Sequence, residues 1–589
     1  MGNILWSFST TIRNPERIPG FFSTVREMEG LEWTKQNQMK FQILLIQKRI
    51  YVPTSENLSQ EQIELLNDYH REMTYEEAED IFKSKKYDDP PMRGRMSFDP
   101  LEKVGLVALI DNKITLTQVG KAFASGEIDF GELFFNALLK QQYPCPLFRF
   151  NSEGYCVKPF IAVLHLIKLV NQLWVEEGHD PIGISRDEFG IFCLNIKRYT
   201  DVYEIAEKLI DYRKQLRSIV GEKNKKEYSK IYTHSYLREF PELDKKLKDY
   251  RDNMIRCLRL TKLIYIRGGG YYIDLEPRRN VEITNLLDTD NGSAKEFTKE
   301  EWTDYIGTID SYTLPWQTEE SLIKIQKSII QDIEKLEDEL KILHSENQIY
   351  SDLKEANDNI VALRQRRQAL ESEKTKIDYS DIDKALEIAG VYDAHLISKS
   401  PNKPSVELER LSTLALNVID DAIEIKPNYP LGDDNEPSFT APRDVPDIEC
   451  FYDDFNMICE VTMLTTRSQW FNEGQPVMRH LRDFEDRSNQ HDNFCIFIAP
   501  KIHDDTLNTF WFATKYEYDG KKQKVLPLTI SQFQELLNKV YELKEDGKKV
   551  YHNQIKSMLE ICTDVASLNG SSEWRQHIKK EFSKWIESL

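Results

Sequence analysis

Residues 445–462 constrain this chain more than any other stretch, because they predict two short β-strands that each carry an acid. Asp447 follows a proline and opens the first strand, and Glu460 ends the apolar run of the second. Asp453 and Asp454 between them suit a turn. Such a hairpin can bring two carboxylates close enough to share a divalent cation, and hard oxygen ligands favour Mg²⁺ over zinc. The alternative is an ordinary surface hairpin with exposed acids.

The residues after the hairpin predict a compact α/β core. A helix near residues 475–487 precedes an apolar strand at 493–499, and further helical patterns follow. Gly474 and Pro476 predict a loop that enters the helix. We therefore expect His480 near the first turns of that helix.

The acid pair resembles that of nucleases of the PD-(D/E)xK type, in which Mg²⁺ held by carboxylates assists phosphodiester hydrolysis. Such nucleases place a lysine two residues after the second acid, and here that position is Thr462. Another group must then handle the attacking water. Glu473 and His480 are the candidates, because a carboxylate or a neutral histidine can orient water or accept its proton. The alternative for His480 is a packed or phosphate-facing side chain.

Composition bounds the class of protein. The 589 residues suit several domains, and a charged fraction of 30% with a mean hydropathy of −0.55 fits a globular protein without a membrane span. The eight cysteines form no CxxC pair and the N-terminal residues lack the flanks of a signal peptide, which favours reduced thiols in a cytoplasm. The net charge of −20 is unusual for a nucleic-acid binder, but binding depends on where basic residues cluster.

Residues 93–123 have the order of elements that a winged helix needs. A helix is followed by a short hairpin that turns at Asp111 and Asn112, and then by another helix. Arg93 and Arg95 stand just before the first helix, where cations can meet phosphate. The alternative is a winged helix that mediates only protein contacts.

Residues 197–279 are basic and contain a second candidate winged helix, with a glycine turn at 268–270. The first eighteen residues add two arginines with hydroxyl and amide neighbours, although that segment also suits a solvated arm. A basic face with two possible wings makes duplex DNA a credible partner. The arginines expected to contact DNA are Arg13, Arg17, Arg93, Arg95, Arg256, Arg259 and Arg267.

Residues 316–377 carry apolar side chains at alternating intervals of three and four, which predicts helices. A break at 344–347 would either close a helical hairpin or interrupt one long helix. We interpret this segment as a helical connector between two functional halves. A dimerising coiled coil is the main alternative.

Short stretches in a specific order along nearly the whole chain resemble the AlwI-type family of type IIS restriction endonucleases, which includes site-specific nicking relatives. The stretches are 11–18, 100–106, 116–121, 139–144, 158–159, 191–194, 204–207, Asp447, 460–462 and 476–480.

The resemblance implies a multidomain α+β protein with an N-terminal winged-helix-like DNA-recognition region, a helical linker and a C-terminal α/β nuclease domain of PD-(D/E)xK type. We expect recognition subdomains at 1–150 and 151–310, the linker at 311–385 and the nuclease domain at 386–589.

The resemblance also implies the site residues. The active-site set is Glu409, Asp447, Glu460, Glu473 and His480. Of these, Glu409, Asp447 and Glu460 are expected to hold Mg²⁺, with Glu407 as the alternative to Glu409. The family itself has threonine after Glu-Val, so Thr462 is compatible with activity.

The expected function is binding of a short asymmetric site in duplex DNA and hydrolysis a few base pairs outside it. One centre cuts one strand, so the second strand needs a transient homodimer or a small partner subunit. A strand-specific nicking enzyme, or the large subunit of a heterodimer, is the alternative within this class. A non-catalytic DNA-binding scaffold is the alternative from another class.

Overall fold

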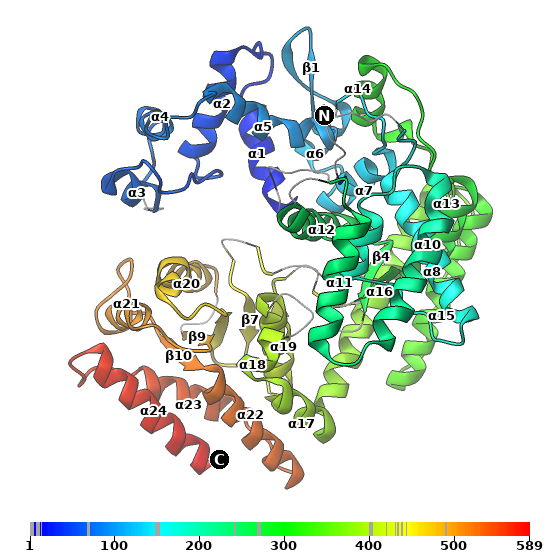
Figure 1. The fold of residues 1–589 in the computed structure, drawn as a ribbon. Helices are drawn as coiled ribbons and strands as arrows, with labels where there is room; N and C mark the ends of the chain where they lie inside the picture. The colour runs from blue at the N-terminus through cyan, green and yellow to red at the C-terminus, as the bar shows by residue number, and fades with distance from the viewer. Residues whose placement is uncertain are drawn as a thin grey trace. The chain divides into compact units, whose positions relative to one another are not determined.

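The computed structural model describes residues 5–6, 12, 15–67, 71–147, 154–240, 243–267, 272–399, 404–419, 421–429, 431–432, 435–437, 440–442, 445–488 and 492–589. They form two compact units, the first ending at Leu322 and the second beginning at Ile323 (Figure 1). Both units combine helices with strands, so the expected mixed α+β class is confirmed. Within these residues, no helix has the length and apolar character needed to cross a membrane.

The first unit is mainly helical. Its helices are α1 (Ile18–Arg26), α2 (Lys35–Gln47), α3 (Gln60–Asn67), α4 (Tyr75–Ser84), α5 (Pro90–Lys103), α6 (Gln118–Ser125), α7 (Phe130–Lys140), α8 (Pro159–Glu176), α9 (Arg186–Glu188), α10 (Val202–Ser218), α11 (Glu222–Tyr236), α12 (Leu243–Arg259), α13 (Asn280–Thr289) and α14 (Lys299–Gly307). Its strands are β1 (Val107–Ile110), β2 (Lys113–Leu116), β3 (Ile184–Ser185), β4 (Ile264–Arg267) and β5 (Tyr272–Leu275).

Strands β1 and β2 form the first expected hairpin. Ile110 pairs with Lys113, and the two residues between them, Asp111 and Asn112, have φ angles of 48° and 59°. A two-residue turn with this left-handed backbone matches the twist of the strands it joins, and Asp and Asn tolerate it better than most residues. With α5 before it and α6 after it, the helix–hairpin–helix order is confirmed.

The helix before this hairpin begins earlier than expected. The side chain of Asp89 accepts a hydrogen bond from the backbone N–H of Met92, and Pro90 occupies the first turn. Arg93 and Arg95 therefore lie inside α5, and the expectation that they precede the helix was wrong. Proline is stable at this position because its missing N–H would have no acceptor in the helix.

The second expected hairpin is also present. Helix α12 leads into β4 and β5, which pair antiparallel, while the residues of the turn lie outside the described part of the chain. A third strand, β3, pairs Ile184 with Ile273 on the other side of β5. Two residues are too few to show an alternating pattern, so this strand had no signal in the sequence.

The second unit contains a five-stranded sheet in the order β10-β9-β8-β7-β6. Its strands are β6 (Glu424–Pro427), β7 (Ile448–Phe451), β8 (Asn456–Val461), β9 (Asn493–Ala499) and β10 (Val525–Thr529). Its helices are α15 (Glu319–Leu340), which begins four residues before the boundary between the units, α16 (Leu353–Ser380), α17 (Ile382–Val391), α18 (Ala394–Lys399), α19 (Pro404–Ile419), α20 (Arg467–Arg487), α21 (Asp504–Lys515), α22 (Ile530–Glu545), α23 (His552–Thr563) and α24 (Ser571–Ser588). Strands β8, β9 and β10 are parallel, whereas β7 and β6 are antiparallel to their neighbours.

Side chains alternate between the two faces of this sheet. On one face Phe451 of β7 meets Phe484 of α20, with ring centroids 5.9 Å apart. Toward the opposite face, α17, α19 and α22 pack around Tyr392, whose hydroxyl lies 2.7 Å from that of Ser412 and whose ring centroid lies 5.2 Å from that of Phe533. The sheet is thus covered on both sides, as its almost wholly buried central strands require.

The segment between α15 and α16 forms neither of the two structures expected for the break at 344–347. Asn359 donates a hydrogen bond to Gln326, and Arg366 donates one to Glu337, so the two helices run in the same direction. The residues between the helices return along α15, because the backbone N–H of Ser345 also donates to Glu337. An extended chain rises about twice as far per residue as a helix, so this short segment can span most of α15. The segment is neither a helical hairpin nor one interrupted helix.

Candidate active site

The register of the sheet places the two hairpin acids opposite each other. Ile448 pairs with Cys459, and the next residues outward are Asp447 and Glu460. Oδ2 of Asp447 accepts a hydrogen bond of 2.8 Å from the backbone N–H of Val461. Asp447 is half-buried and Glu460 is buried, so the hairpin is not the exposed surface hairpin that remained the alternative.

Helix α20 brings the downstream candidates to the same place. Glu473 and His480 are seven residues apart, which is two helical turns, so both side chains lie on one face. Nδ1 of His480 lies 2.8 Å from Oε1 of Glu460. The helix begins at Arg467 with Thr466 as its cap, so His480 lies well inside it and the expected loop at 474–476 was wrong.

Burial and mutual repulsion dominate the electrostatics of these carboxyl groups. Burial, followed by the charges of Glu460 and Glu473, raises the pKa of Asp447 well above its usual value, against the lowering effect of the Val461 N–H. Burial and the charge of Glu473 likewise raise the pKa of Glu460. Burial raises the pKa of Glu473 too, and its hydrogen bond with Thr462 opposes that rise. Three acids so close together favour the arrival of a cation.

The carboxylates at this site suit a Mg²⁺ ion that is held only in part by the protein. Among the residues that the structure describes, no group of three or more His, Cys, Asp or Glu side chains could hold a metal ion. Mg²⁺ commonly binds through one or two carboxylates, with water and substrate phosphate completing its shell. Asp447 and Glu460 fit that mode, because they are adjacent hard oxygen donors, and burial together with neighbouring negative charge raises the pKa of both.

Thr462, at the position where nucleases of the PD-(D/E)xK type carry lysine, has a contact that the sequence did not predict. It follows β8 directly, lies on the same face as Glu460, and is buried. Its hydroxyl hydrogen-bonds Glu473, while its backbone N–H donates to the carbonyl of Ile498 at 3.0 Å. The only available signal was its spacing of two residues from Glu460. That spacing predicted that Thr462 lies on the same face of the sheet as Glu460, but it did not predict the contact with Glu473 of α20.

Glu409 is buried on α19, and Oε2 accepts a hydrogen bond of 2.8 Å from the backbone N–H of Ala441. The carboxylates that raise the pKa of Asp447 are Glu460 and Glu473, whereas the charge of Glu409 acts on Tyr429. Its place among the metal ligands stays a prediction.

The alternative to Glu409 has a partner of its own. Glu407 lies 3.6 Å from Arg410, which also pairs with Glu436 at 2.5 Å. Glu407 as a metal ligand in place of Glu409 also stays a prediction.

The arginines expected to contact DNA have varied surroundings. Arg13 lies outside the described residues, and of Arg267 only the backbone is described. Arg17 donates to the carbonyl of Ile50 at 2.7 Å and Arg95 pairs with Asp89 at 2.7 Å. DNA contact by any of these side chains stays a prediction.

The other three arginines lie on helices. Arg93 stacks over the ring of Tyr87, 4.4 Å from its centroid. Arg256 and Arg259 are half-buried in the last turn of α12.

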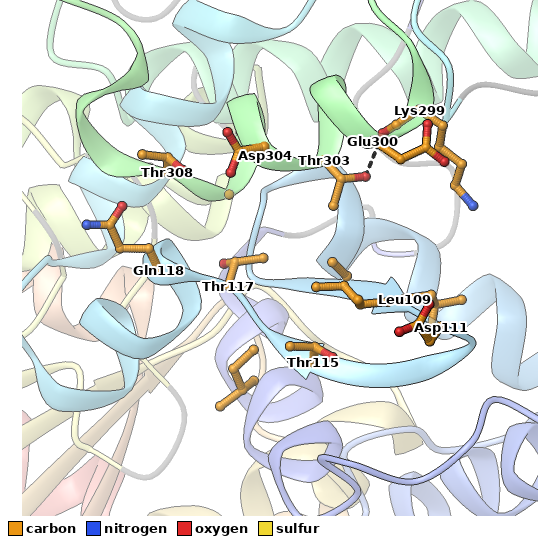
Figure 2. A pocket seen from close by; sticks show the side chains of 14 residues that line it. Leu109, Asp111, Thr115, Thr117, Gln118, Lys299, Glu300, Thr303, Asp304 and Thr308 are labelled. Carbon is orange, nitrogen blue, oxygen red and sulfur yellow. Dashed lines mark hydrogen bonds between the residues drawn. The ribbon is translucent and has the colours of Figure 1, made fainter.

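A pocket of about 480 Å³ lies between the β1–β2 hairpin and α14 in the first unit (Figure 2). Figure 2 shows Thr303 and Asp304 on the α14 side, where the hydroxyl of Thr303 donates to the backbone carbonyl of Lys299 at 2.8 Å. The pocket is lined by one cation, Lys299, and by three acids, Asp111, Glu300 and Asp304. This negative lining is unsuited to a DNA phosphate.

Comparisons with known proteins bear on these sites. No curated protein matches the chain. One solved structure is the small subunit of the heterodimeric restriction endonuclease R.BspD6I, with 23% identity, a TM-score of 0.28, and coverage of 34% of this chain and 98% of that one. Another is the BpuJ1 endonuclease binding domain in complex with pyrene- and phenanthrene-modified DNA, with 13% identity, a TM-score of 0.32, and coverage of 52% and 97%.

A family model decides the assignment. The model of the AlwI restriction endonuclease family matches residues 102–536, which is well over half of the chain and includes both the first hairpin and the acid cluster. The chain belongs to the AlwI restriction endonuclease family.

Proposed function

We propose that this chain is a type IIS restriction endonuclease that reads a short asymmetric site in duplex DNA and hydrolyses phosphodiester bonds outside it with Mg²⁺. The observation that carries the proposal is the convergence of Asp447 and Glu460 from two paired strands with Glu473 and His480 from one face of α20. Membership of a restriction endonuclease family supports a DNA endonuclease as the general class.

Each side chain of the cluster has a distinct task in this proposal. Asp447 and Glu460 would hold Mg²⁺, which supplies a Lewis acid for the scissile phosphate when bound. Glu473, half-buried and held by Thr462, orients the attacking water. His480 is buried and fixes Glu460 through Nδ1, so we assign it a positioning role instead of proton transfer with water.

Cleavage outside the recognition site fits a chain made of two compact units. The first unit holds both candidate wings, at β1–β2 and β4–β5, and the second unit holds the acid cluster. A recognition unit bound to an asymmetric site would hold the nuclease unit at a fixed distance from that site along the duplex. We propose the PD-(D/E)xK type for the second unit, and winged-helix-like recognition for the first, on these grounds.

Cutting both strands requires two centres. The described residues contain one such cluster per chain, so the second strand would be cut in a transient homodimer or by a small partner subunit. Plasmid that stops at the open-circle form at high enzyme concentration would instead indicate a strand-specific nicking enzyme or a heterodimer subunit. The eight free thiols suit a reducing compartment such as a bacterial-type cytoplasm.

The direct test is cleavage of plasmid DNA by Asp447→Asn and Glu460→Gln variants in Mg²⁺. Each substitution keeps the shape of the side chain but removes a metal-binding charge, so we expect a loss of at least about a thousandfold. The matched control is Glu424→Gln, an exposed acid of the same sheet. Run-off sequencing of the cleaved ends gives the site, the offset and the strand. Undiminished cleavage by both variants would refute the assigned centre.

A further inference from the structure

We propose that a basic pocket between α10, α11 and α12 holds a phosphate of the DNA backbone. The inference rests on the proposed function, because it names a contact through which the same enzyme would hold its substrate. The pocket has a volume of about 660 Å³ and lies within the first unit. None of the arginines that the sequence pointed to as DNA contacts lines it.

The lining of the pocket is strongly cationic. Its basic residues are Arg213, Arg217, Lys225, Lys226, Lys230 and Arg251. Its two acids already have partners, because Glu188 accepts hydrogen bonds of 2.8 and 2.7 Å from Arg213, and Asp187 lies 2.5 Å from Arg251. Arg217, Lys226 and Lys230 line the pocket in addition to these two pairs. In a chain with a net charge of −20, such a cluster creates a local positive potential that attracts polyanions.

Helix α11 presents two lysines to this pocket. Lys226 and Lys230 are four residues apart, so they lie on one face of the helix beside Ser229, which also lines the pocket. Both lysines are exposed, and neither forms an ion pair with any side chain in the described part of the chain. The flexible side chains of these lysines allow their ammonium groups to pair with a phosphate of the DNA backbone.

Helix α10 contributes two guanidinium groups that are held in place. Arg213 lies 5.0 Å and Arg217 lies 4.5 Å from the ring centroid of Trp174. Arg213 is buried, and its Nη1 has no hydrogen-bond partner among the residues that the structure describes. A buried donor without an acceptor is costly, so it points to an oxygen that the chain itself does not supply. Fixed guanidinium groups also match the geometry of phosphate oxygens.

The first unit has a second pocket whose lining has the opposite charge. The pocket in Figure 2 combines three acids with a single lysine, so it would repel a phosphate that the α10–α12 pocket attracts. The α10–α12 pocket is also the larger of the two, at about 660 Å³ against about 480 Å³.

The test is binding of a fluorescently labelled 30-base-pair duplex of mixed sequence to the full chain, in Ca²⁺ so that cleavage does not interfere. We expect Lys226→Gln and Lys230→Gln each to weaken binding about fivefold and to reduce the slope of log K against log salt by about one, as loss of a phosphate contact predicts. Lys223→Gln is the matched control, because it removes the same charge from an exposed position of the same helix outside the pocket lining.

The outcomes separate this inference from the proposed function. If both pocket variants bind like Lys223→Gln, with an unchanged salt slope, the pocket is not a phosphate site. If the wild type does not bind the duplex at all, the inference also fails. If the pocket variants lose affinity as expected but the wild type cleaves no DNA in Mg²⁺, the pocket stands and the nuclease proposal fails. Thermal melts of each variant confirm that the fold is retained.

Discussion

Replacing Thr462 with valine tests how the proposed site works without the lysine that nucleases of the PD-(D/E)xK type carry at this position. Valine has nearly the shape of threonine, so it fills the same buried space after β8 and leaves the backbone hydrogen bond to Ile498 intact. What it removes is the hydroxyl that hydrogen-bonds Glu473. A hydrogen bond to a charged group contributes about 1.5 to 3 kcal/mol. If that contribution is made in the transition state, the single-turnover rate falls about 10- to 150-fold.

The assay is single-turnover cleavage of supercoiled plasmid in Mg²⁺, with the melting temperature measured alongside. Thr462→Ser is the control, because it restores the hydroxyl and removes only the methyl group. We expect the serine variant to keep most of the rate and the valine variant to melt within a few degrees of the wild type. A valine variant that cleaves within twofold of the wild type would refute the role of the hydroxyl. A serine variant as slow as the valine variant would assign the effect to packing.

Two further predictions concern the same cluster. Without Mg²⁺, the free energy of unfolding should fall as the pH rises above about 4. The pKa values of Asp447 and Glu460 are higher in the folded protein than in the unfolded chain, so the folded protein binds more protons. Asp447→Asn should therefore raise the free energy of unfolding of the metal-free protein at pH 8 by about 1 kcal/mol, measured by denaturant melts. If the variant is no more stable than the wild type, the carboxylates do not repel one another as inferred. His480→Ala should lower kcat about tenfold by loosening Glu460, without changing the shape of the pH–rate profile. Loss of the acid limb of that profile would make His480 the general base.

Local patterns in the sequence predicted the local elements well. The turn at Asp111 and Asn112 was predictable because few other residues tolerate the left-handed backbone of such a turn. The start of α5 was missed, although Asp89 and Pro90 carried a capping signal. The interior proline of α20, Pro476, was taken as a helix entry because its cost in a helix is normally high.

Longer-range features had no comparable signal. The return of the chain along α15 depends on side chains such as Glu337, which binds both Ser345 and Arg366, and no periodicity encodes such a contact. The pocket between α10, α11 and α12 collects cations from segments separated by tens of residues. The basic character of residues 197–279 was evident, but its concentration at one pocket was not.

The sequence by itself determined the strand pair and the acids on it, because alternation along a strand fixes the face on which each side chain lies. It therefore sufficed to place Asp447 and Glu460 together. Only the tertiary structure decided the contacts around this acid pair. Because α20 packs against the sheet, His480 contacts Glu460, and Glu473 hydrogen-bonds the neighbouring Thr462. Helix packing depends on how whole surfaces of side chains fit, and no local pattern of residues records that fit.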